Sequence, residues 1–312
     1  MRCIFEISLE QPEIAKEELK RCLGSRIIRT EGQMVLATCG NKDFARLAYT
    51  NRAFEALFSC RNDELEKAIQ EYDWQSIYRD DFSVRKARRH GEWLSEEQIA
   101  SMIWKKLKAP KVKLKGSRTQ IVFFFGRRAY CGRLLWENKK EFLMRKAHLR
   151  PRLHPSSMHP RLAKACVNLS GVRSGSIIDP FCGSGGILIE AGLMGINITG
   201  SDIDSKMIER CRINLLHYGL TNHVLNKASA KEIFGNYDAI VTDLPYGRNT
   251  KAIQRKDMKI FFKRSYVCAP VAIVMVASGT HTKELLGKWK VEKRFTYYLH
   301  KSLSKTILVL KR

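Results

Sequence analysis

Three kinds of segment are missing from this chain of 312 residues, and each absence narrows the class of protein. No apolar run approaches the roughly 20 residues that cross a bilayer, so we expect no transmembrane helix. The first residues carry Glu6 and Glu10 and have no long apolar core, which argues against a signal peptide. The nine cysteines include no Cys-x-x-Cys pair, so we expect reduced thiols, no metal site and a cytoplasmic location.

Acidic residues are scarce beside basic ones. The chain has 31 Asp and Glu against 56 Lys and Arg, and its formal net charge is +25. Residues 82–150 alone hold 19 Lys and Arg against 5 Asp and Glu, whereas a merely soluble surface mixes its signs. A polyanionic partner is the simplest explanation. Nucleic acid and an anionic membrane surface are both open, and we favour nucleic acid because no amphipathic helix with a bulky apolar face accompanies the basic run.

The N-terminal half predicts two small α+β domains. Residues 1–60 read as strands at 2–9, 26–30 and 34–38 with helices at 12–23 and 43–58, an order typical of a ferredoxin-like domain. Residues 61–150 read as strands at 81–88, 111–114, 119–125 and 129–135, with a helix at 95–107 that opens on a capping box of Ser95 and Gln98. The strand at 81–88 would carry a basic face.

Three prolines then mark residues 151–170 as a linker that ends in a lead-in helix at 161–169. From residue 171 to 312 strands alternate with helices. We expect strands at 176–179, 197–201, 237–242 and 270–277, helices at 185–194, 205–218 and 282–289, and a final antiparallel pair at 295–299 and 306–310. This order predicts an α/β fold, a doubly wound parallel sheet with a reversed last strand.

Two loops of this α/β domain have the composition of a nucleoside site. In such sheets ligands bind beyond the carboxyl ends of the strands. The first strand ends in residues 179–186 (DPFCGSGG) and the second in residues 200–204 (GSDID). Glycines let a ligand approach the backbone, and Asp202 follows Asp179 by 23 residues, close to the spacing of about 20 at which an acid meets ribose hydroxyls.

The same loops exclude two common ligand classes. The chain has no G-x-x-x-x-G-K-[ST] loop to grip the phosphates of ATP, and the first loop does not match the G-x-G-x-x-G of NAD enzymes. An acid at the end of the first strand would repel a pyrophosphate but suits a ligand with a positively charged end. S-adenosylmethionine carries an ammonium, a sulfonium and a ribose.

Residues 242–247 (TDLPYG) follow a short β-branched strand. Asp243 can accept hydrogen bonds from an amino group, Pro245 stiffens the loop, and Tyr246 can stack on a flat ring. Asp, Pro and Gly are also turn residues, so these six residues alone predict either an ordinary turn or a site for an amino-bearing ring.

Together these stretches resemble motifs I, II and IV of Rossmann-like, S-adenosylmethionine-dependent methyltransferases. Residues 242–247 look like the [D/N/S]-P-P-[Y/F] signature of amino methylation, and residues 61–150 resemble a THUMP domain, an RNA-binding module of tRNA-modifying enzymes. The whole chain is similar to the tRNA (guanine-10) N2-methyltransferase family of archaea and eukaryotes. The resemblance implies methyl transfer from S-adenosylmethionine to the N2 amino group of a tRNA guanosine, position 10 being the expected target, and allows for a small zinc-ribbon activator subunit.

The resemblance also implies roles for residues at the cofactor end of the site. Asp179 and the backbone of Gly183 and Gly185, with Phe181 in the same loop, would hold the methionine end. Asp202 would take the ribose hydroxyls, with Asp204 as the fallback acid. Ile203 would lie against the adenine, and Ser229 stands where motif III often has an adenine-reading Asp.

At the substrate end, Asp243 and the Leu244 carbonyl would accept hydrogen bonds from the guanine amino group. Pro245 would fix the loop and Tyr246 would stack on the flipped base. Leu244 departs from the usual Pro of the signature, although its carbonyl is still available.

Other functions use the same residues. The target could be another tRNA guanosine or a ribosomal RNA guanosine, or the amino group of adenine in DNA. The chain could also be a binding-only RNA protein with a degenerate catalytic domain, which Leu244 and Ser229 would support. The basic module favours RNA, since RNA is read largely by backbone and shape.

Overall fold

The computed structural model describes residues 1–87, 94–155, 157–245, 254–300 and 303–312. It divides into two compact units, each treated by itself below. Unit 1 comprises Met1–Pro12, Leu23–Phe44 and Thr50–Lys139, and unit 2 comprises Glu13–Cys22, Ala45–Tyr49 and Lys140–Arg312. Among the helices of the described residues, none has the length and apolar character needed to cross a membrane.

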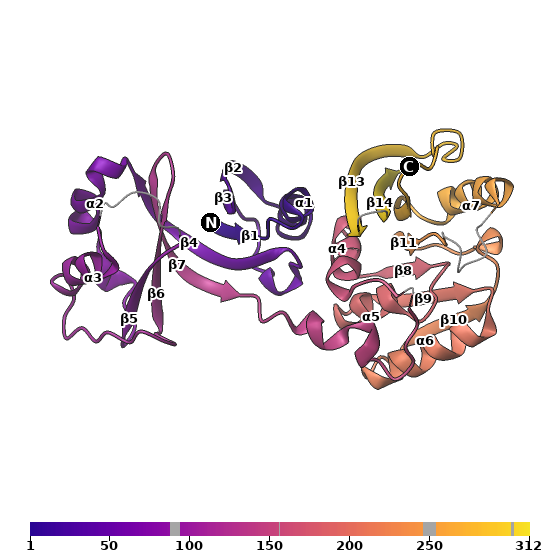
Figure 1. The fold of residues 1–312 in the computed structure, drawn as a ribbon, viewed down its shortest axis with the longest axis horizontal. Helices are drawn as coiled ribbons and strands as arrows, with labels where there is room; N and C mark the ends of the chain where they lie inside the picture. The colour runs from indigo at the N-terminus through magenta and orange to yellow at the C-terminus, as the bar shows by residue number, and fades with distance from the viewer. Residues whose placement is uncertain (88–93, 156, 246–253, 301–302) are drawn as a thin grey trace. The chain divides into compact units, whose positions relative to one another are not determined.

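Unit 1 contains one seven-stranded sheet with the strand order β2-β3-β1-β4-β7-β6-β5 (Figure 1). Its strands are β1 (Arg2–Ile7), β2 (Arg26–Glu31), β3 (Met34–Thr38), β4 (Thr50–Cys60), β5 (Phe82–Lys86), β6 (Thr119–Phe125) and β7 (Ala129–Glu137). The unit also holds α2 (Leu65–Glu71) and α3 (Glu96–Trp104). Because β4 pairs with β1 on one side and β7 on the other, the expected domain boundary after residue 60 falls within one continuous sheet.

The helix expected over residues 43–58 is wrong. Only a 3-10 turn forms there, η1 (Phe44–Arg46), and β4 follows as an eleven-residue strand in the middle of the sheet. The register of β4 against β7 shifts between Ala53 and Phe54 and again between Ala56 and Phe58. Bulges of this kind break the two-residue alternation by which a strand is recognised in a sequence.

The strand expected over residues 111–114 is also wrong. This segment makes only an isolated bridge between Val112 and Phe82, and Val112 and Leu114 are exposed. Alternating lysines and apolar residues form a stable strand when the apolar side chains pack against a core. Val112 and Leu114 have no such contact in the described structure. The helix expected at 95–107 is confirmed in a shorter form, with both hydrogen bonds of the Ser95–Gln98 capping box present.

Unit 2 contains a second seven-stranded sheet with the order β10-β9-β8-β11-β12-β14-β13. Its strands are β8 (Ser176–Asp179), β9 (Asn197–Asp202), β10 (His223–Lys227), β11 (Ala239–Asp243), β12 (Val271–Ala277), β13 (Lys290–His300) and β14 (Leu303–Lys311). Its helices are α1 (Pro12–Leu23, all but the end residues), α4 (Pro160–Ser170), α5 (Gly186–Leu193), α6 (Ser205–His217) and α7 (Arg255–Cys268). Short 3-10 helices of the chain are η2 (Asn62–Glu64), η3 (Trp74–Ser76), η4 (Glu141–Arg145), η5 (Ala147–Leu149) and η6 (Ala230–Glu232).

The predicted fold class is confirmed in this sheet. Strands β10, β9, β8, β11 and β12 are parallel, and β14 runs antiparallel between β12 and β13. Helices cover both faces: Cys166 of α4 contacts Met275 of β12, whereas Phe261 of α7 belongs to a core cluster with Val274 on the opposite face of the same strand. All parallel strands therefore end at one edge, where a ligand can bind.

Three further differences from the expected elements lie in unit 2. Helix α7 and the exposed edge strand β10 were not expected, and the helix expected over residues 282–289 is instead a series of turns. Leu285, Leu286 and Trp289 are buried there as a helix would bury them, but Gly287 has a φ of +57°. A residue in the left-handed region ends a helical turn, so the apolar spacing is kept without a helix.

Candidate active site

Three acids lie at the carboxyl edge of the second sheet. Asp179 ends β8, Asp202 ends β9 and Asp243 ends β11. β8 pairs with both β9 and β11, so the three carboxyl groups end neighbouring parallel strands. The structure thus brings together the acids that the sequence singled out.

Asp179 is almost completely buried, with 2% of its surface exposed. Its Oδ1 accepts hydrogen bonds from the Thr242 hydroxyl at 2.6 Å and from the Phe181 amide at 3.1 Å. Burial raises the pKa of Asp179 to about 7 against the effect of these two bonds, and the charges of Asp243 and Asp202 add to the rise. Asp179 therefore keeps its proton to a higher pH than an exposed acid does, and a nearby cation would favour its charged form.

The loop after β8 has the backbone that its glycines predict. Gly183 and Gly185 have φ values of +52° and +89°. A Cβ on Gly185 would lie 2.8 Å from the Cys211 sulfur, so no larger residue fits there. The ring of Phe181 packs against the ring of Phe261 in the core, with their centroids 5.4 Å apart. The backbone amide of Phe181 takes part in the loop by donating to Asp179.

Asp202 holds the two loops together. Its Oδ2 accepts from the Gly183 amide at 3.0 Å, and its Oδ1 accepts from the Asp204 amide at 2.9 Å. Asp204 itself caps α6 through the Lys206 amide, so this fallback acid has a structural task. Between them Ile203 is 74% exposed, an apolar side chain left open directly after a strand. Ser229 caps η6 by accepting from the Lys231 amide.

Asp243 has two differently placed oxygens. Its Oδ2 forms an ion pair with the Lys305 ammonium, whereas its Oδ1 is buried and has no hydrogen-bond partner within the described part of the chain. Burial raises the pKa of Asp243, and Lys305 opposes that rise. Leu244 directs its side chain into the core and donates its amide to Met275, and Pro245 is half-buried. Tyr246 lies outside the described residues.

Two buried cations near these loops were not expected from the sequence. One is Lys305, which pairs with Asp243. Arg150 is 5% exposed, and its Nη1 and Nη2 make no hydrogen bond within the described residues. Nη1 lies 3.4 Å from the position that a Cβ on Gly186 would take, at the start of α5. No sequence pattern marks these two residues as buried, because a buried cation looks like any other among the 56 Lys and Arg of the chain.

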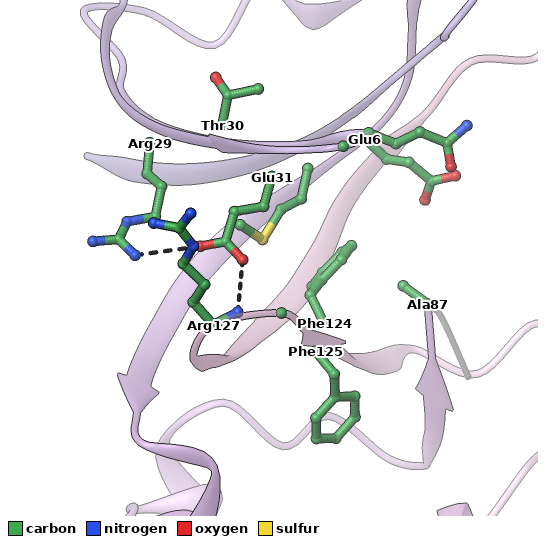
Figure 2. Close-up of a pocket in the computed structure, with 12 residues that line it drawn as sticks. Glu6, Arg29, Thr30, Glu31, Ala87, Phe124, Phe125 and Arg127 are labelled. Atoms are coloured by element: carbon green, nitrogen blue, oxygen red, sulfur yellow. Dashed lines mark hydrogen bonds and ion pairs between the residues drawn. The ribbon is translucent and has the colours of Figure 1, made fainter. Parts of the chain in front are cut away.

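Unit 1 holds a separate pocket of about 590 Å³ over its sheet. Figure 2 shows Glu31 between Arg29 and Arg127, with Phe124 and Phe125 from the end of β6 beside them. Glu31 accepts from the Arg127 amide at 3.0 Å and from the Arg29 guanidinium at 3.3 Å. The pocket combines cationic, acidic and aromatic groups. It could not be predicted from the sequence, because its walls come from segments that are far apart along the chain.

Unit 1 also carries an exposed run of lysines between α3 and β6. We call it the lysine segment, and it consists of Lys105, Lys106, Lys108, Lys111, Lys113 and Lys115. No regular strand or helix holds this segment after α3 apart from the bridge at Val112. It is the part of the basic module that the structure leaves most open to solvent.

The fold and the three acids define the class of this protein. TrmN from Thermus thermophilus has the same fold, with a TM-score of 0.55 at 19% identity over 100% of both chains. The SMU.472 protein, complexed with SAH, gives a TM-score of 0.50 at 16% identity over 99% of this chain and 97% of that one. A family profile described as "RMKL-like, methyltransferase domain" matches residues 147–295, and one described as "DNA methylase" matches residues 13–212. The chain is a methyltransferase with a Rossmann-like catalytic fold.

Similar sequences narrow this class to one family. The tRNA (guanine(10)-N2)-dimethyltransferase of Methanothermobacter thermautotrophicus is 33% identical over 335 residues, which cover 100% of both chains. The enzyme of the same name from Pyrococcus abyssi is 30% identical over 325 residues, covering 96% of each. This chain belongs to the tRNA (guanine(10)-N2)-dimethyltransferase family.

Proposed function

We propose that this chain transfers methyl groups from S-adenosylmethionine to the N2 amino group of a guanosine in tRNA, with guanosine 10 as the target. The observation that carries the proposal is the buried Oδ1 of Asp243 at the carboxyl end of β11, which no described residue pairs by a hydrogen bond. A buried acceptor without a donor is costly unless a ligand supplies the donor. An exocyclic amino group is such a donor, and the names of the family's members supply the nucleoside.

The amino nitrogen of guanine is a poor nucleophile because its lone pair is shared with the ring. Asp243 Oδ1 and the Leu244 carbonyl are two acceptors that would draw its hydrogens out of the ring plane and so free the lone pair. The freed lone pair would attack the methyl group that bound S-adenosylmethionine supplies, with the thioether as the leaving group, and one N2 proton would pass to solvent water. Leu244 stands where the family signature usually has Pro, but its backbone carbonyl is still available as an acceptor. Tyr246 would stack on the extruded base.

The residues around the first two loops fit S-adenosylmethionine, which when bound supplies an activated methyl group. Asp179 would pair with the ammonium, and the open backbone of Gly183, where an added Cβ would meet nothing within 4 Å, would admit the methionine chain. Asp202 would accept from the ribose hydroxyls, and the exposed Ile203 offers an apolar surface for the adenine. Ser229, at the motif III position, would hydrogen-bond to the adenine edge.

Arg150 adds a group that the resemblance did not include. Its terminal nitrogens lie beside the start of α5, near the Tyr218 hydroxyl and without a hydrogen bond to the other described residues. The carboxylate of the methionine end is the anion that would bind there. A buried guanidinium and a carboxylate form a strong, directional pair.

Unit 1 is proposed to bind the tRNA, with residues 61–150 acting as a THUMP domain. The exposed lysine segment supports phosphate contacts, because such contacts need many solvated cations rather than buried pairs. The pocket beside Arg29 and Phe125 supports contact with an unstacked nucleotide, since aromatic rings and guanidinium groups are the usual platforms for bases.

The test is methyl transfer to defined transcripts. The purified chain is incubated with labelled S-adenosylmethionine and unmodified tRNA, and the nucleosides are separated after digestion. We expect label in N2-methylated guanosine, lost when guanosine 10 is replaced by adenosine. Mass analysis of the same digest counts one methyl group or two. Label in adenosine of a DNA duplex, or in another guanosine, would instead support the alternatives that the sequence left open.

The same assay tests two remaining expectations. A small zinc-ribbon activator subunit is not required if the chain alone is active. A binding-only protein would retain tRNA without any transfer. A cytoplasmic location remains part of the proposal and is checked by fractionation of the source cells.

A further inference from the structure

Lys305 is a buried lysine on the strand that runs opposite to the others. It lies near the start of β14, paired in register with Ala277 of β12, and only 4% of its side chain is exposed. Because β14 is antiparallel, its first residues lie at the same edge as the last residues of β11. Lys305 therefore reaches the carboxyl edge from the reversed strand.

The two-residue alternation of the strands places Lys305 and Asp243 on the same face of the sheet. Leu308 and Leu310 of β14 belong to the core cluster on the α7 face, so Lys305 has the parity of the opposite face. On β11 Ile240 belongs to the same cluster, so Asp243 also points away from α7. The Lys305 ammonium contacts the Asp243 Oδ2 across β12.

We propose that Lys305 is a positioning residue for methyl transfer, which holds the Asp243 carboxylate ionised and turned so that its Oδ1 faces the substrate amino group. The inference rests on the function proposed above. The ammonium occupies one oxygen and leaves the other free, so it selects which oxygen accepts from the substrate. Burial of a lysine costs desolvation free energy unless its charge is balanced by a partner. Here the ammonium balances the negative charge of the Asp243 carboxylate that the reaction needs.

Removal of Lys305 would change the hydrogen-bonding character of Asp243. A protonated carboxyl group has one O–H donor and a weaker acceptor than a carboxylate. It would accept less strongly from the substrate amino group, and an O–H on Oδ1 would face the substrate N–H as a second donor. Among the described residues, the charges that bear on Asp243 are the Lys305 ammonium on β14 and the Asp179 carboxylate on β8. Cys166 on α4 lies near them as a neutral thiol, because burial raises its pKa. The Lys305 ammonium favours the ionised Asp243, and a negative charge on Asp179 opposes it.

The experiment compares Lys305→Met, Lys305→Arg and a matched control in single-turnover methyl transfer between pH 5.5 and 8.5. The control is Lys311→Met, which removes a lysine from the same strand that pairs with Glu292 at 3.0 Å on the surface. For Lys305→Met we expect a rate loss on the order of 10²-fold at pH 7.5, with cofactor affinity changed less than about threefold. The acidic limb of its pH profile should move upward by about one pH unit or more, because the acid loses its cation. Lys305→Arg should restore most of the rate, and Lys311→Met should match the wild type.

A second comparison separates positioning from folding. Asp243→Asn keeps an acceptor oxygen and cannot ionise, and the family signature admits Asn at this position. In that background Lys305→Met should have little further effect on the rate, because there is no carboxylate to hold. If Lys305→Met alone does not fold, two other measurements test the inference. They are the ratio of the methyl-transfer rates of Asp243→Asn and the double variant, and the pH profile of the rate of Lys305→Arg.

An unshifted pH profile and full rate in folded Lys305→Met would overturn the inference, as would equal losses in the wild-type and Asp243→Asn backgrounds. Failure of the proposed function is distinguished from this because the wild type itself would then transfer no methyl group to tRNA guanosine.

Discussion

The two units of this chain use charge in opposite ways. In unit 2 the important charges are few, buried and individually partnered, as in Asp179 with Thr242, Asp243 with Lys305, and Arg145 with Glu190. In unit 1 the charges are many and exposed, as in the lysine segment. Buried groups have fixed directions and act strongly on one atom, whereas exposed groups act collectively and are screened by salt. Substitutions in the two units should therefore differ sharply in size.

The largest effect is expected at Asp243. Asp243→Ala removes the acceptor for the substrate amino group, so we expect the rate of methyl transfer to fall by at least about 10³-fold. Cofactor affinity should change little, because the cofactor is assigned to β8 and β9. Calorimetric titration with the cofactor and single-turnover assays measure the two quantities. Glu209→Ala, which breaks an exposed pair with Arg212 on α6, is the control. Retained turnover in Asp243→Ala would remove the role assigned to this residue.

The next effect concerns stability and involves Glu18 of α1. Its buried carboxylate accepts from the amides of Ala48 and Tyr49 at 3.0 and 2.9 Å, and from Asn168 of α4 at 2.7 Å. Glu18→Ala leaves three buried donors without an acceptor, so we expect a loss of about 3 to 5 kcal/mol in the free energy of unfolding. Urea denaturation measures it.

Glu13→Ala on the same helix is the matched control, since Glu13 is 70% exposed in its pair with Lys16. A comparable loss in both variants would contradict the distinction between buried and exposed charges. The Glu18 contacts also mean that α1 and residues 45–49 belong with unit 2. A truncation that begins after residue 139 would therefore leave Asn168 without these partners.

The third effect is pH-dependent and involves Asp179. In the proposed site only the ionised form of Asp179 would pair with the cofactor's ammonium, and the pKa of Asp179 is raised to about 7. Affinity for S-adenosylmethionine should therefore level off about one pH unit above this pKa and fall by up to about tenfold for each pH unit below it. Asp179→Asn should weaken binding on the order of 10²-fold at pH 8 and abolish the pH dependence. Titration calorimetry at several pH values measures both.

The sign is opposite for the stability of the ligand-free protein. An acid whose pKa is raised by folding stabilises the fold at low pH and loses that contribution as pH rises through its folded value. Asn keeps the oxygen that accepts from Thr242 and Phe181, so Asp179→Asn should be at least as stable as the wild type at pH 8. Asp238→Asn, at the opposite end of the sheet where Asp238 accepts from Ser176, is the control and should leave cofactor affinity unchanged. A binding curve for Asp179→Asn that still followed pH would assign the titration to another group.

The sequence predicted elements with regular apolar spacing better than elements whose spacing is interrupted or whose apolar residues stay exposed. The strands at 176–179 and 119–125 and the helix at 12–23 have the bounds expected for them, because their apolar spacing is regular. The strand β4 was read as a helix because its two bulges hide the alternation. The exposed segment at 111–114 was expected to be a strand because lysines and apolar residues alternate in it. It forms no regular strand, since Val112 and Leu114 have no apolar surface to pack against.

The same division holds within the candidate site. Asp179, Asp202 and Asp243 follow strands and could be found from spacing, since parallel strands end at one edge. Lys305 could not be found, because its meeting with Asp243 depends on the antiparallel insertion of β14 and on its register with β12. Pairing between strands that are distant in sequence leaves no local pattern.

The smallest effects are expected in the lysine segment. Lys111→Ala removes one of six neighbouring cations, so we expect tRNA affinity to fall only a few-fold and the slope of log affinity against log salt to become shallower by about 1. Replacement of all six lysines should weaken binding far more, because each contributes a similar phosphate contact. Filter binding between 50 and 300 mM salt gives both values. Lys67→Ala serves as the control, since Lys67 lies beside Glu71 on α2 and is equally exposed. If Lys111→Ala alone abolished binding, this lysine would act as the buried charges of unit 2 do, through one fixed contact, and the contrast between the units would fail.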